Sequence, residues 1–340
     1  MSQATPRQIV KEILQGNTPE RPLIVPIVFA LGAKIENLPF RAYLENPTKI
    51  TNALRQIRGQ LRTDGVSCYF DPLLEVEAFG FSLREEANQV RSYEWPETAP
   101  KGKLPTGLRT PEAAASSARV VVAEDVIRRM KSLLRDEPLL MAGVSGPVTL
   151  AKRLIQVPPH EVLREEGEEI IALHPALELA NEGIMRIASK FVEAGANLIF
   201  IREEFLPAIS SDLWVRLQSL LAPVFNVIRF YEALPVLQVP GGPQIEANAQ
   251  MILDQPSEAV LCSPSTELMT ESARREGCIP LGISLPTEIL QTRGGPGASF
   301  QLPNGAKPVM LTTDGDVPVT TDLKCLMAAF NVMRQGIENS

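Results

Sequence analysis

The stretch FVEAGANLIFIREEF, residues 191–205, contains the unit from which the fold can be predicted. It begins with the end of an amphipathic helix predicted over 174–194, and the next residue, Gly195, is a usual residue for ending a helix. The apolar run 197–202 then predicts a buried strand, and two glutamates follow directly. A helix, a glycine turn and a buried strand with polar residues at its end indicate an α/β protein with a parallel sheet.

Short apolar runs bounded by turn residues recur along the rest of the chain. With the run above they predict eight strands, over 23–28, 66–70, 139–144, 197–202, 235–239, 259–263, 279–284 and 308–313. Strands alternating with helices in this number favour closure into a single (β/α)8 TIM barrel. An open doubly wound sheet is the alternative, but no GxGxxG motif follows an early strand.

Helical periodicity fills most of the intervals between these strands. It predicts helices over 48–61, 124–134, 148–156, 174–194, 244–253, 266–275 and 322–335. Residues 1–340 are predicted to form one domain, with an N-terminal helical extension over 1–20. Segment 84–109 contains three prolines, fits neither helix nor strand, and predicts an irregular excursion that caps one end of the barrel.

The composition excludes several functional classes. The 340 residues are 44% hydrophobic and 21% charged, with a net charge of −7, so a basic nucleic-acid or membrane-binding surface is not expected. No apolar run reaches the roughly 18 residues that span a bilayer, and the polar N-terminus lacks the apolar core of a signal peptide. We therefore expect a cytoplasmic protein, in which the four scattered cysteines are free thiols.

Acidic residues follow several of the predicted strands, at the end of the barrel where active sites lie. Crowded carboxylates raise one another's pKa and so provide a general acid, or they bind a hard cation such as Mg2+. Alternatively, some of them face solvent or pair with Arg202 and Lys34. The candidate catalytic residues are Asp71, Glu203, Glu204, Asp314 and Asp316.

Other residues at the same strand ends are candidates for substrate binding. Ser145 opens a Ser-Gly-Pro turn before a helix, where backbone amides bind an anion or the serine caps the helix. Cys262 is either a small buried apolar residue or a reactive thiol. The two histidines, His160 and His174, lie far from any predicted strand end, which argues against a histidine-based site. The candidate substrate-binding residues are Phe29, Ser145, Arg202, Gln238 and Cys262.

Four segments, in the same order along the chain, resemble the uroporphyrinogen decarboxylase superfamily. AGVSGPVTLAKRL (142–154) resembles the GAPWTLA segment of uroporphyrinogen decarboxylases and the GPFTLA segment of the related corrinoid-dependent methyltransferases. FVEAGANLIFIREEF (191–205) resembles the AGAD segment of both groups. DGVSCYFDPLLEVEAFG (64–80) is closer to the methyltransferases, and LTTDGDVPVTTD (311–322) resembles the family's last strand and loop. The resemblance implies a TIM barrel of the uroporphyrinogen decarboxylase type.

The chain departs from both groups at their functional positions. The decarboxylases carry an arginine-rich RQAGRY stretch where this chain has VFALGAK (28–34), and their late histidine falls near Gly315. The methyltransferases that activate a thiol bind zinc through HxCG, which aligns with 238–241 (QVPG), and through a later cysteine that also falls near Gly315. We therefore expect the zinc-thiolate site to be lost. A rebuilt metal site is a hypothesis, with Glu203, Cys262, Asp314 and Asp316 as its ligands.

Three functional hypotheses follow. The first is a methyltransferase-type enzyme with an acidic site, linked to a corrinoid or another methyl carrier and so to a corrinoid protein. The second is a decarboxylase acting on a tetrapyrrole or another carboxylic acid, although a substrate with eight carboxylates suits an acidic mouth poorly. The third is a non-catalytic barrel that binds a ligand or a partner. The resemblance also suggests a homodimer and a small-molecule or tetrapyrrole-type ligand, with a divalent metal as an alternative cofactor.

Overall fold

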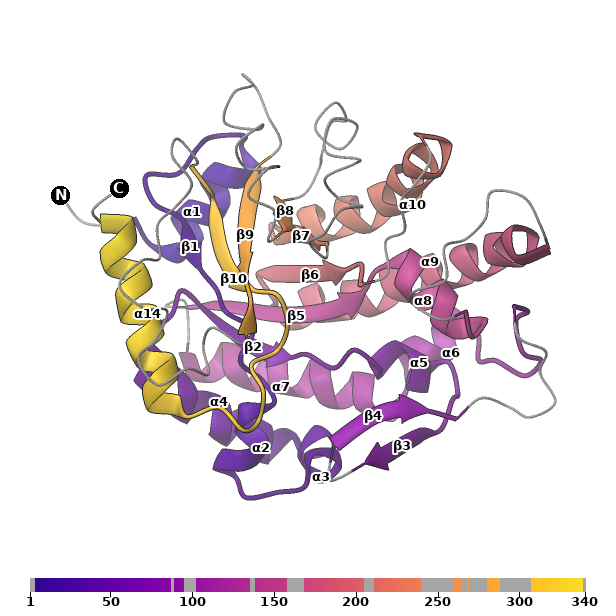
Figure 1. The fold of residues 1–340 in the computed structure, drawn as a ribbon, viewed down its shortest axis with the longest axis horizontal. Coiled ribbons are helices and arrows are strands. Elements are labelled where there is room, and N and C mark those ends of the chain that lie inside the picture. The colour runs from indigo at the N-terminus through magenta and orange to yellow at the C-terminus, as the bar shows by residue number, and fades with distance from the viewer. Residues whose placement is uncertain are drawn as a thin grey trace.

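A computed structural model gives the structure of the protein (Figure 1), and it describes residues 4–86, 89–94, 102–134, 138–157, 168–204, 211–239, 260–263, 268, 280–287 and 307–338. Eight parallel strands form one sheet with helices between them, which confirms the predicted TIM barrel. Each predicted strand has its counterpart. The strands are β1 (Leu23–Ile24), β2 (Gly65–Tyr69), β5 (Leu139–Ser145), β6 (Leu198–Arg202), β7 (Leu234–Gln238), β8 (Val260–Ser263), β9 (Leu281–Leu285) and β10 (Met310–Thr313).

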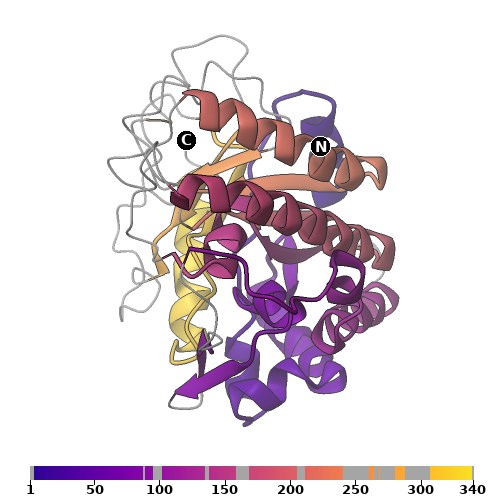
Figure 2. The ribbon, with the colours of Figure 1, turned by 90° about the vertical axis from the view of Figure 1, so that its right-hand side faces the viewer.

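Helices surround this sheet. Figure 2 shows α9 and α10 side by side on the outside of the molecule. The predicted helices over 244–253 and 266–275 lie outside the described residues, apart from Leu268. In the described part of the chain, no helix is long and apolar enough to span a membrane. The helices are α1 (Pro6–Leu14), α2 (Leu31–Ile35), α3 (Phe40–Leu44), α4 (Pro47–Leu61), α5 (Leu74–Ala78), α6 (Pro111–Ala115), α7 (Ala118–Leu134), α8 (Pro147–Leu154), α9 (Glu168–Ala194), α10 (Ser211–Phe230) and α14 (Leu323–Glu338).

The barrel is nearly closed, with one seam between β1 and β2. The strand order runs from β1 through β10, β9, β8, β7, β6 and β5 to β2, so β1 and β2 form the two edges. Side chains bridge these edges. Asp64 accepts a hydrogen bond from the Ile24 amide at 2.8 Å. Ser67 accepts from the Val28 amide at 3.0 Å and donates to the Pro26 carbonyl at 3.2 Å. Pro26 has no N–H to give to a ladder, which explains why β1 is only two residues long.

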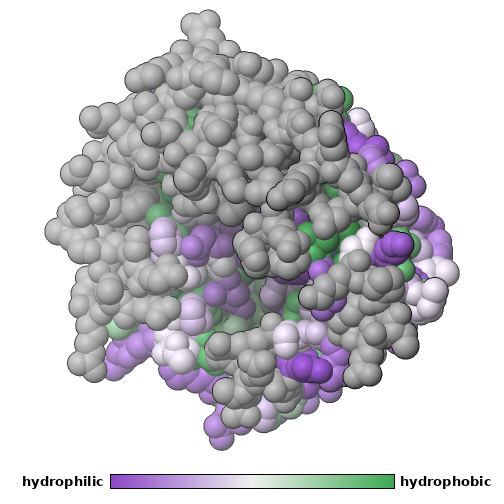
Figure 3. Space-filling view, turned by 45° about the vertical axis from the view of Figure 1, so that its right-hand side comes forward, coloured by the Kyte–Doolittle hydropathy of each residue, from purple (hydrophilic) through white to green (hydrophobic). Residues whose placement is uncertain are grey.

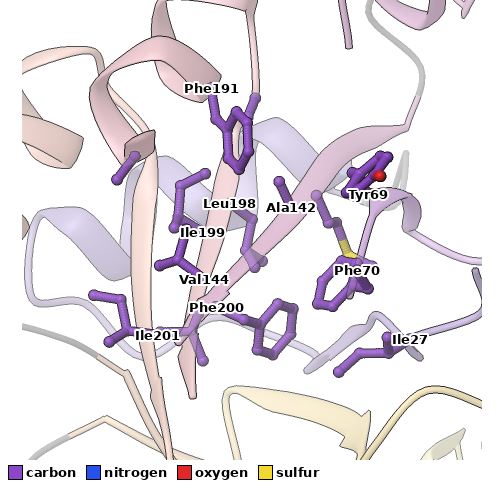
Figure 4. Close-up of a cluster of buried hydrophobic side chains, with 14 of the residues drawn as sticks. Ile27, Tyr69, Phe70, Ala142, Val144, Phe191, Leu198, Ile199, Phe200 and Ile201 are labelled. Carbon is purple, nitrogen blue, oxygen red and sulfur yellow. The ribbon is translucent and has the colours of Figure 1, made fainter. Parts of the chain in front are cut away.

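The interior of the barrel is filled by apolar side chains from alternate positions of the strands. Phe70 and Phe200 point toward one another there, with ring centroids 5.7 Å apart (Figure 4). Gly143 leaves space for this pair, because a Cβ atom at that position would lie 2.7 Å from the Phe70 ring. The core is therefore closed below the mouth, and chemistry is restricted to the strand ends.

The excursion over 84–109 is more regular than expected. Strands β3 (Leu83–Glu86) and β4 (Gln89–Tyr93) form an antiparallel hairpin, so the expectation of a segment without strands is wrong. The hairpin strands are short and rich in charged residues, which hid their pattern. The Tyr93 hydroxyl donates to the Arg153 carbonyl at 2.9 Å, and the Gly102 amide donates to the Ile155 carbonyl at 2.8 Å. These bonds attach the excursion to the end of α8.

Candidate active site

The carboxyl ends of β2, β5 and β6 surround a small recess in the mouth of the barrel. On the face shown in Figure 3, hydrophilic residues lie inside a hollow among hydrophobic ones. Four of the predicted site residues, Asp71, Ser145, Arg202 and Glu204, line this recess together with apolar residues. The recess is lined by Phe70, Asp71, Pro72, Gly143, Val144, Ser145, Arg202 and Glu204.

Asp71 lies at the recess and is held in a buried ion pair. Its carboxylate accepts a hydrogen bond from Arg119 of α7, and one oxygen also accepts from the Leu73 amide at 3.1 Å. Arg119 donates in addition to Glu77, which Arg41 contacts at 2.8 Å. The Asp71 side chain is only 1% exposed. Asp71 therefore balances the charge of Arg119, and its own freedom to act on a substrate is small.

Glu203 caps helix α8 from the neighbouring strand. Its carboxylate accepts from the amides of Val148 and Thr149 at 2.9 and 2.8 Å and from the Thr149 hydroxyl at 2.7 Å. The helix amides thus bind an anion, but this anion is a side chain of the protein itself. Gly146 is the N-cap residue and has no side chain to bond the helix. Burial raises the pKa of Glu203 to about 7, against the three hydrogen bonds, which lower it.

Ser145 does not cap α8 but binds a second buried carboxylate. Its amide and hydroxyl donate to Glu75 of α5 at 3.0 and 2.9 Å. The hydroxyl oxygen accepts from Arg153 of α8 at 3.1 Å. Burial raises the pKa of Glu75 to about 6, although Ser145 and Arg153 oppose the shift. Ser145 therefore connects the recess to a carboxyl group that titrates near neutral pH.

Glu204 and Arg202 lie together at the end of β6. Glu204 accepts from Arg153 at 2.5 Å, and its other oxygen lies 3.4 Å from Arg202 Nη2. Arg202 Nε donates to Gln238 Oε1 at 3.1 Å. Gln238 in turn donates to the Thr313 carbonyl at 2.7 Å. Gln238 is 5% exposed, so its side chain supports Arg202 and is itself shielded from the mouth.

Asp316 lies on the opposite side of the mouth, after β10. Its two carboxylate oxygens accept from the backbone amides of Phe29 and Ala30, each at 2.8 Å. The side chain is partly shielded, and loss of solvation raises its pKa to about 7. The two amides and the Arg202 charge oppose the shift, and Asp71 adds to it. Asp316 is thus the predicted catalytic carboxyl that combines partial access with a pKa near neutral pH.

Two of the predicted substrate-binding side chains lie away from the mouth. The Phe29 ring is fully buried and packs on Tyr43 and Tyr69, with centroids 5.4 and 5.0 Å away. Cys262 is also fully buried, with its sulfur 3.6 Å from the sulfur of Met310, and burial raises the pKa of its thiol far above the usual range. Both side chains lie in the core, away from the mouth where a substrate was expected to contact them. Of the two expectations for Cys262, a buried apolar residue or a reactive thiol, the structure shows the first.

The four residues of the hypothetical metal site do not come together. Glu203 binds the start of α8, Cys262 lies in the core, and Asp316 binds backbone amides. Asp314 is exposed and accepts from the Thr287 amide at 3.0 Å. Within the described part of the chain, no three His, Cys, Asp or Glu side chains are grouped in a way that could hold a metal ion.

Three residues of the mouth were not predicted: Glu75, Arg119 and Arg153. Glu75 belongs to the same post-strand segment as Asp71, and its apolar neighbours in α5 are a signal for a buried acid. Arg153 is part of the motif over 142–154 that carries the family resemblance. Arg119 is 48 residues from Asp71, and nothing in its sequence surroundings indicates the contact.

Comparisons with known proteins identify the family and the fold of the chain. Residues 5–224 match the family model described as uroporphyrinogen decarboxylase (URO-D). A solved methyltransferase from Methanosarcina mazei has a TM-score of 0.74 at 17% identity, covering 97% of this chain and 98% of that one. A B12-independent methionine synthase from Shewanella sp. W3-18-1 has a TM-score of 0.43 at 13% identity, covering 86% and 87%. The chain matches no curated protein sequence. The likeness to the methyltransferase shows that the two chains share their fold.

Proposed function

Since this chain belongs to the uroporphyrinogen decarboxylase (URO-D) family, we propose that it is a methyltransferase-type enzyme with an acidic active site in the barrel mouth. The expected methyl carrier is a corrinoid, brought by a partner protein, or another carrier of the same kind. This expectation comes from the motifs over 64–80 and 142–154, which resemble corrinoid-dependent methyltransferases.

Asp316 is the observation that supports this proposal most strongly. Burial raises the pKa of its carboxyl to about 7, and the residue is partly exposed at the mouth. A group with a pKa near the working pH both donates and accepts protons efficiently. Methyl transfer from oxygen or nitrogen leaves an electron pair to be protonated, and methyl transfer to a thiol requires removal of the thiol proton. Asp316 is suited to either step.

Glu75 supplies a second proton acceptor through Ser145. The Ser145 hydroxyl lines the recess and donates to Glu75 at 2.9 Å. A proton from a substrate in the recess passes to the serine oxygen as the serine proton passes to Glu75. Arg153, which donates to the same oxygen at 3.1 Å, stabilises the negative charge that develops on the serine oxygen as its proton leaves for the Glu75 carboxylate.

The zinc site of the thiol-activating methyltransferases does not fit the residues present. Where those enzymes carry HxCG, this chain has Gln238, which is engaged by Arg202 and the Thr313 carbonyl. Among the described residues, Cys262 does not supply a thiolate ligand, because it packs against Met310 in the core. We therefore propose that carboxyl groups, and not a zinc ion, carry out the acid–base chemistry.

The test is methyl transfer from methylcobalamin to 2-mercaptoethanol, followed by the loss of the methyl–cobalt absorbance. Removal of a general acid or base lowers rates about 10²–10⁴-fold, so we expect Asp316→Asn to lower kcat at least ~100-fold. Asp314→Asn is the matched control, because Asp314 is exposed and binds a loop amide, and its rate should stay within about twofold.

Each other outcome points away from the proposal. Carbon dioxide release from a carboxylic acid or a tetrapyrrole, without methyl transfer, would support the decarboxylase hypothesis. Ligand binding with neither reaction would support a non-catalytic barrel. Equal rates for the wild type, Asp316→Asn and Asp314→Asn would remove Asp316 from the mechanism.

A further inference from the structure

Arg202 presents unused hydrogen-bond donors to the recess. Its Nε is bonded to Gln238, and its contact with Glu204 is an ion pair at 3.4 Å, longer than a normal hydrogen bond. Among the described residues, neither Nη atom of Arg202 makes a hydrogen bond to the protein. The side chain is 14% exposed and lines the recess, so these donors are within reach of a ligand.

The guanidinium is also fixed in position, which is what a binding group requires. Gln238 donates to the Thr313 carbonyl at 2.7 Å and to the Ser284 hydroxyl at 3.3 Å. Because its amide nitrogen is used in this way, its oxygen faces Arg202 Nε. The ends of β6, β7, β9 and β10 thus hold Arg202 with its two Nη atoms directed away from Gln238.

The carboxylates around Arg202 already have other hydrogen-bond partners. Asp71 is paired with Arg119, and Glu204 is bonded to Arg153 at the shorter distance of 2.5 Å. Asp316 is bonded to two backbone amides and not to Arg202. The positive charge of Arg202 therefore lacks a hydrogen-bonded counter-charge, and the paired Nη atoms of a guanidinium match the two oxygens of a carboxylate.

We infer that Arg202 binds a carboxylate group of a small substrate in the recess, with Gln238 as its positioning residue. The inference rests on the proposed function for the placement of the substrate at the mouth. A single negative charge suits this site better than a phosphate dianion, because Glu204 and Asp316 lie nearby.

The test compares propionate with propionamide, which has nearly the same shape but no charge, by ligand-observed NMR titration in chloride buffer. We expect propionate to bind the wild type at least ~10-fold more tightly than propionamide, as for a hydrogen-bonded charge pair. Arg202→Met should lose this preference. Arg202→Lys, which keeps the positive charge but lacks the two parallel N–H donors of a guanidinium, should keep part of it. Gln238→Leu, which removes the acceptor of Arg202 Nε, should weaken propionate binding, and Gln238→Glu should weaken it too, because the new carboxylate competes with propionate for Arg202.

Arg109→Met is the matched control, because Arg109 is exposed and donates only to the Ala78 carbonyl, at 3.3 Å. It should bind propionate like the wild type. If Arg202→Met does not fold, Arg202→Gln serves in its place. Propionate binding that is absent in the wild type, that is unchanged in the Arg202 variants or that is weaker than binding of inorganic phosphate would overturn the inference.

The binding assay needs no turnover, so the two proposals fail separately. A wild type that binds propionate through Arg202 but transfers no methyl group overturns the proposed function and keeps the carboxylate site. A wild type that transfers methyl groups to 3-mercaptopropionate, a thiol that carries a carboxylate, with the same kcat/KM after Arg202→Met, overturns the carboxylate site and keeps the proposed function.

Discussion

Glu203 and Glu204 are sequence neighbours with different tasks, because successive residues after a strand point in different directions. Glu203 turns inward and binds the start of α8, whereas Glu204 contacts the two arginines of the mouth. A sequence shows that both are acidic and follow a strand. It does not show which of them meets helix amides, since those amides lie more than 50 residues earlier in the chain.

Glu75 gives a prediction for the dependence of stability on pH. Burial raises its pKa from 4.5 to about 6, so the folded state keeps the proton to a higher pH than the unfolded chain does. Its contribution to the free energy of unfolding is therefore fully present below pH 4.5 and is lost as the pH rises through about 6. A shift of this size corresponds to about 2 kcal/mol.

Glu75→Gln removes this titration and keeps the hydrogen bonds, because the amide accepts from the Ser145 N–H and donates to the Ser145 oxygen. Between pH 4.5 and pH 7 we expect the free energy of unfolding of the variant to rise by about 2 kcal/mol relative to wild type. Urea denaturation at a series of pH values measures this difference. A constant difference over that range would show that Glu75 titrates as in the unfolded chain.

At the scale of elements, helix α8 depends on a carboxylate from another strand. Glu203→Ala leaves the Val148 and Thr149 donors buried without a partner, and we expect it to lower the free energy of unfolding by about 2 kcal/mol. Gly146→Ala should also destabilise, because a Cβ atom there would lie 2.2 Å from the Glu203 carboxyl carbon. The backbone of Gly146, with φ −76° and ψ 160°, accepts alanine without strain.

The double variant Gly146→Ala, Glu203→Ala tests whether Gly146→Ala destabilises the protein through its contact with Glu203 or through any change at position 146. Once Glu203 is shortened to alanine, the space that the new methyl group needs is free. Gly146→Ala should then cost at least about 1 kcal/mol less than it does in the wild type, a non-additivity measured by urea denaturation of the four proteins. Additive effects would mean that the two residues do not meet.

The elements differ in how well the sequence predicts them. All eight barrel strands could be located, because buried parallel strands are short, mostly apolar runs bounded by turn residues. Helices α2, α3, α5 and α6 were missed, since five residues make little more than one turn and show no periodicity. The 20-residue helix α10 was also missed, and it contains a proline, Pro223. The acidic residues of the mouth could be predicted because they directly follow predicted strands. Their partners Arg119 and Arg153 lie on helices distant in the sequence, and only the structure shows these contacts.

For the whole molecule, closure of the barrel depends on side chains at one seam. Between β1 and β2 no ladder forms, and Ser67 bonds both the Val28 amide and the Pro26 carbonyl. Thr313 and Thr312 complete the other side of the same segment, bonding the Ile27 amide at 3.0 Å and the Val25 carbonyl at 2.9 Å. Hydroxyl groups thus replace the backbone partners that a continuous ladder would supply.

Ser67→Ala tests this account of closure. It leaves a buried N–H and a buried carbonyl without partners, and each such group costs about 1–3 kcal/mol, so we expect the free energy of unfolding to fall by about 2–4 kcal/mol. The matched control is Ser132→Ala on α7, where the exposed hydroxyl donates to the Arg128 carbonyl of its own helix, and its effect should stay below about 0.5 kcal/mol. Urea denaturation followed by circular dichroism measures both. Equal stabilities of the two variants would mean that water or a backbone shift satisfies the seam, and that the barrel does not rely on Ser67 to close.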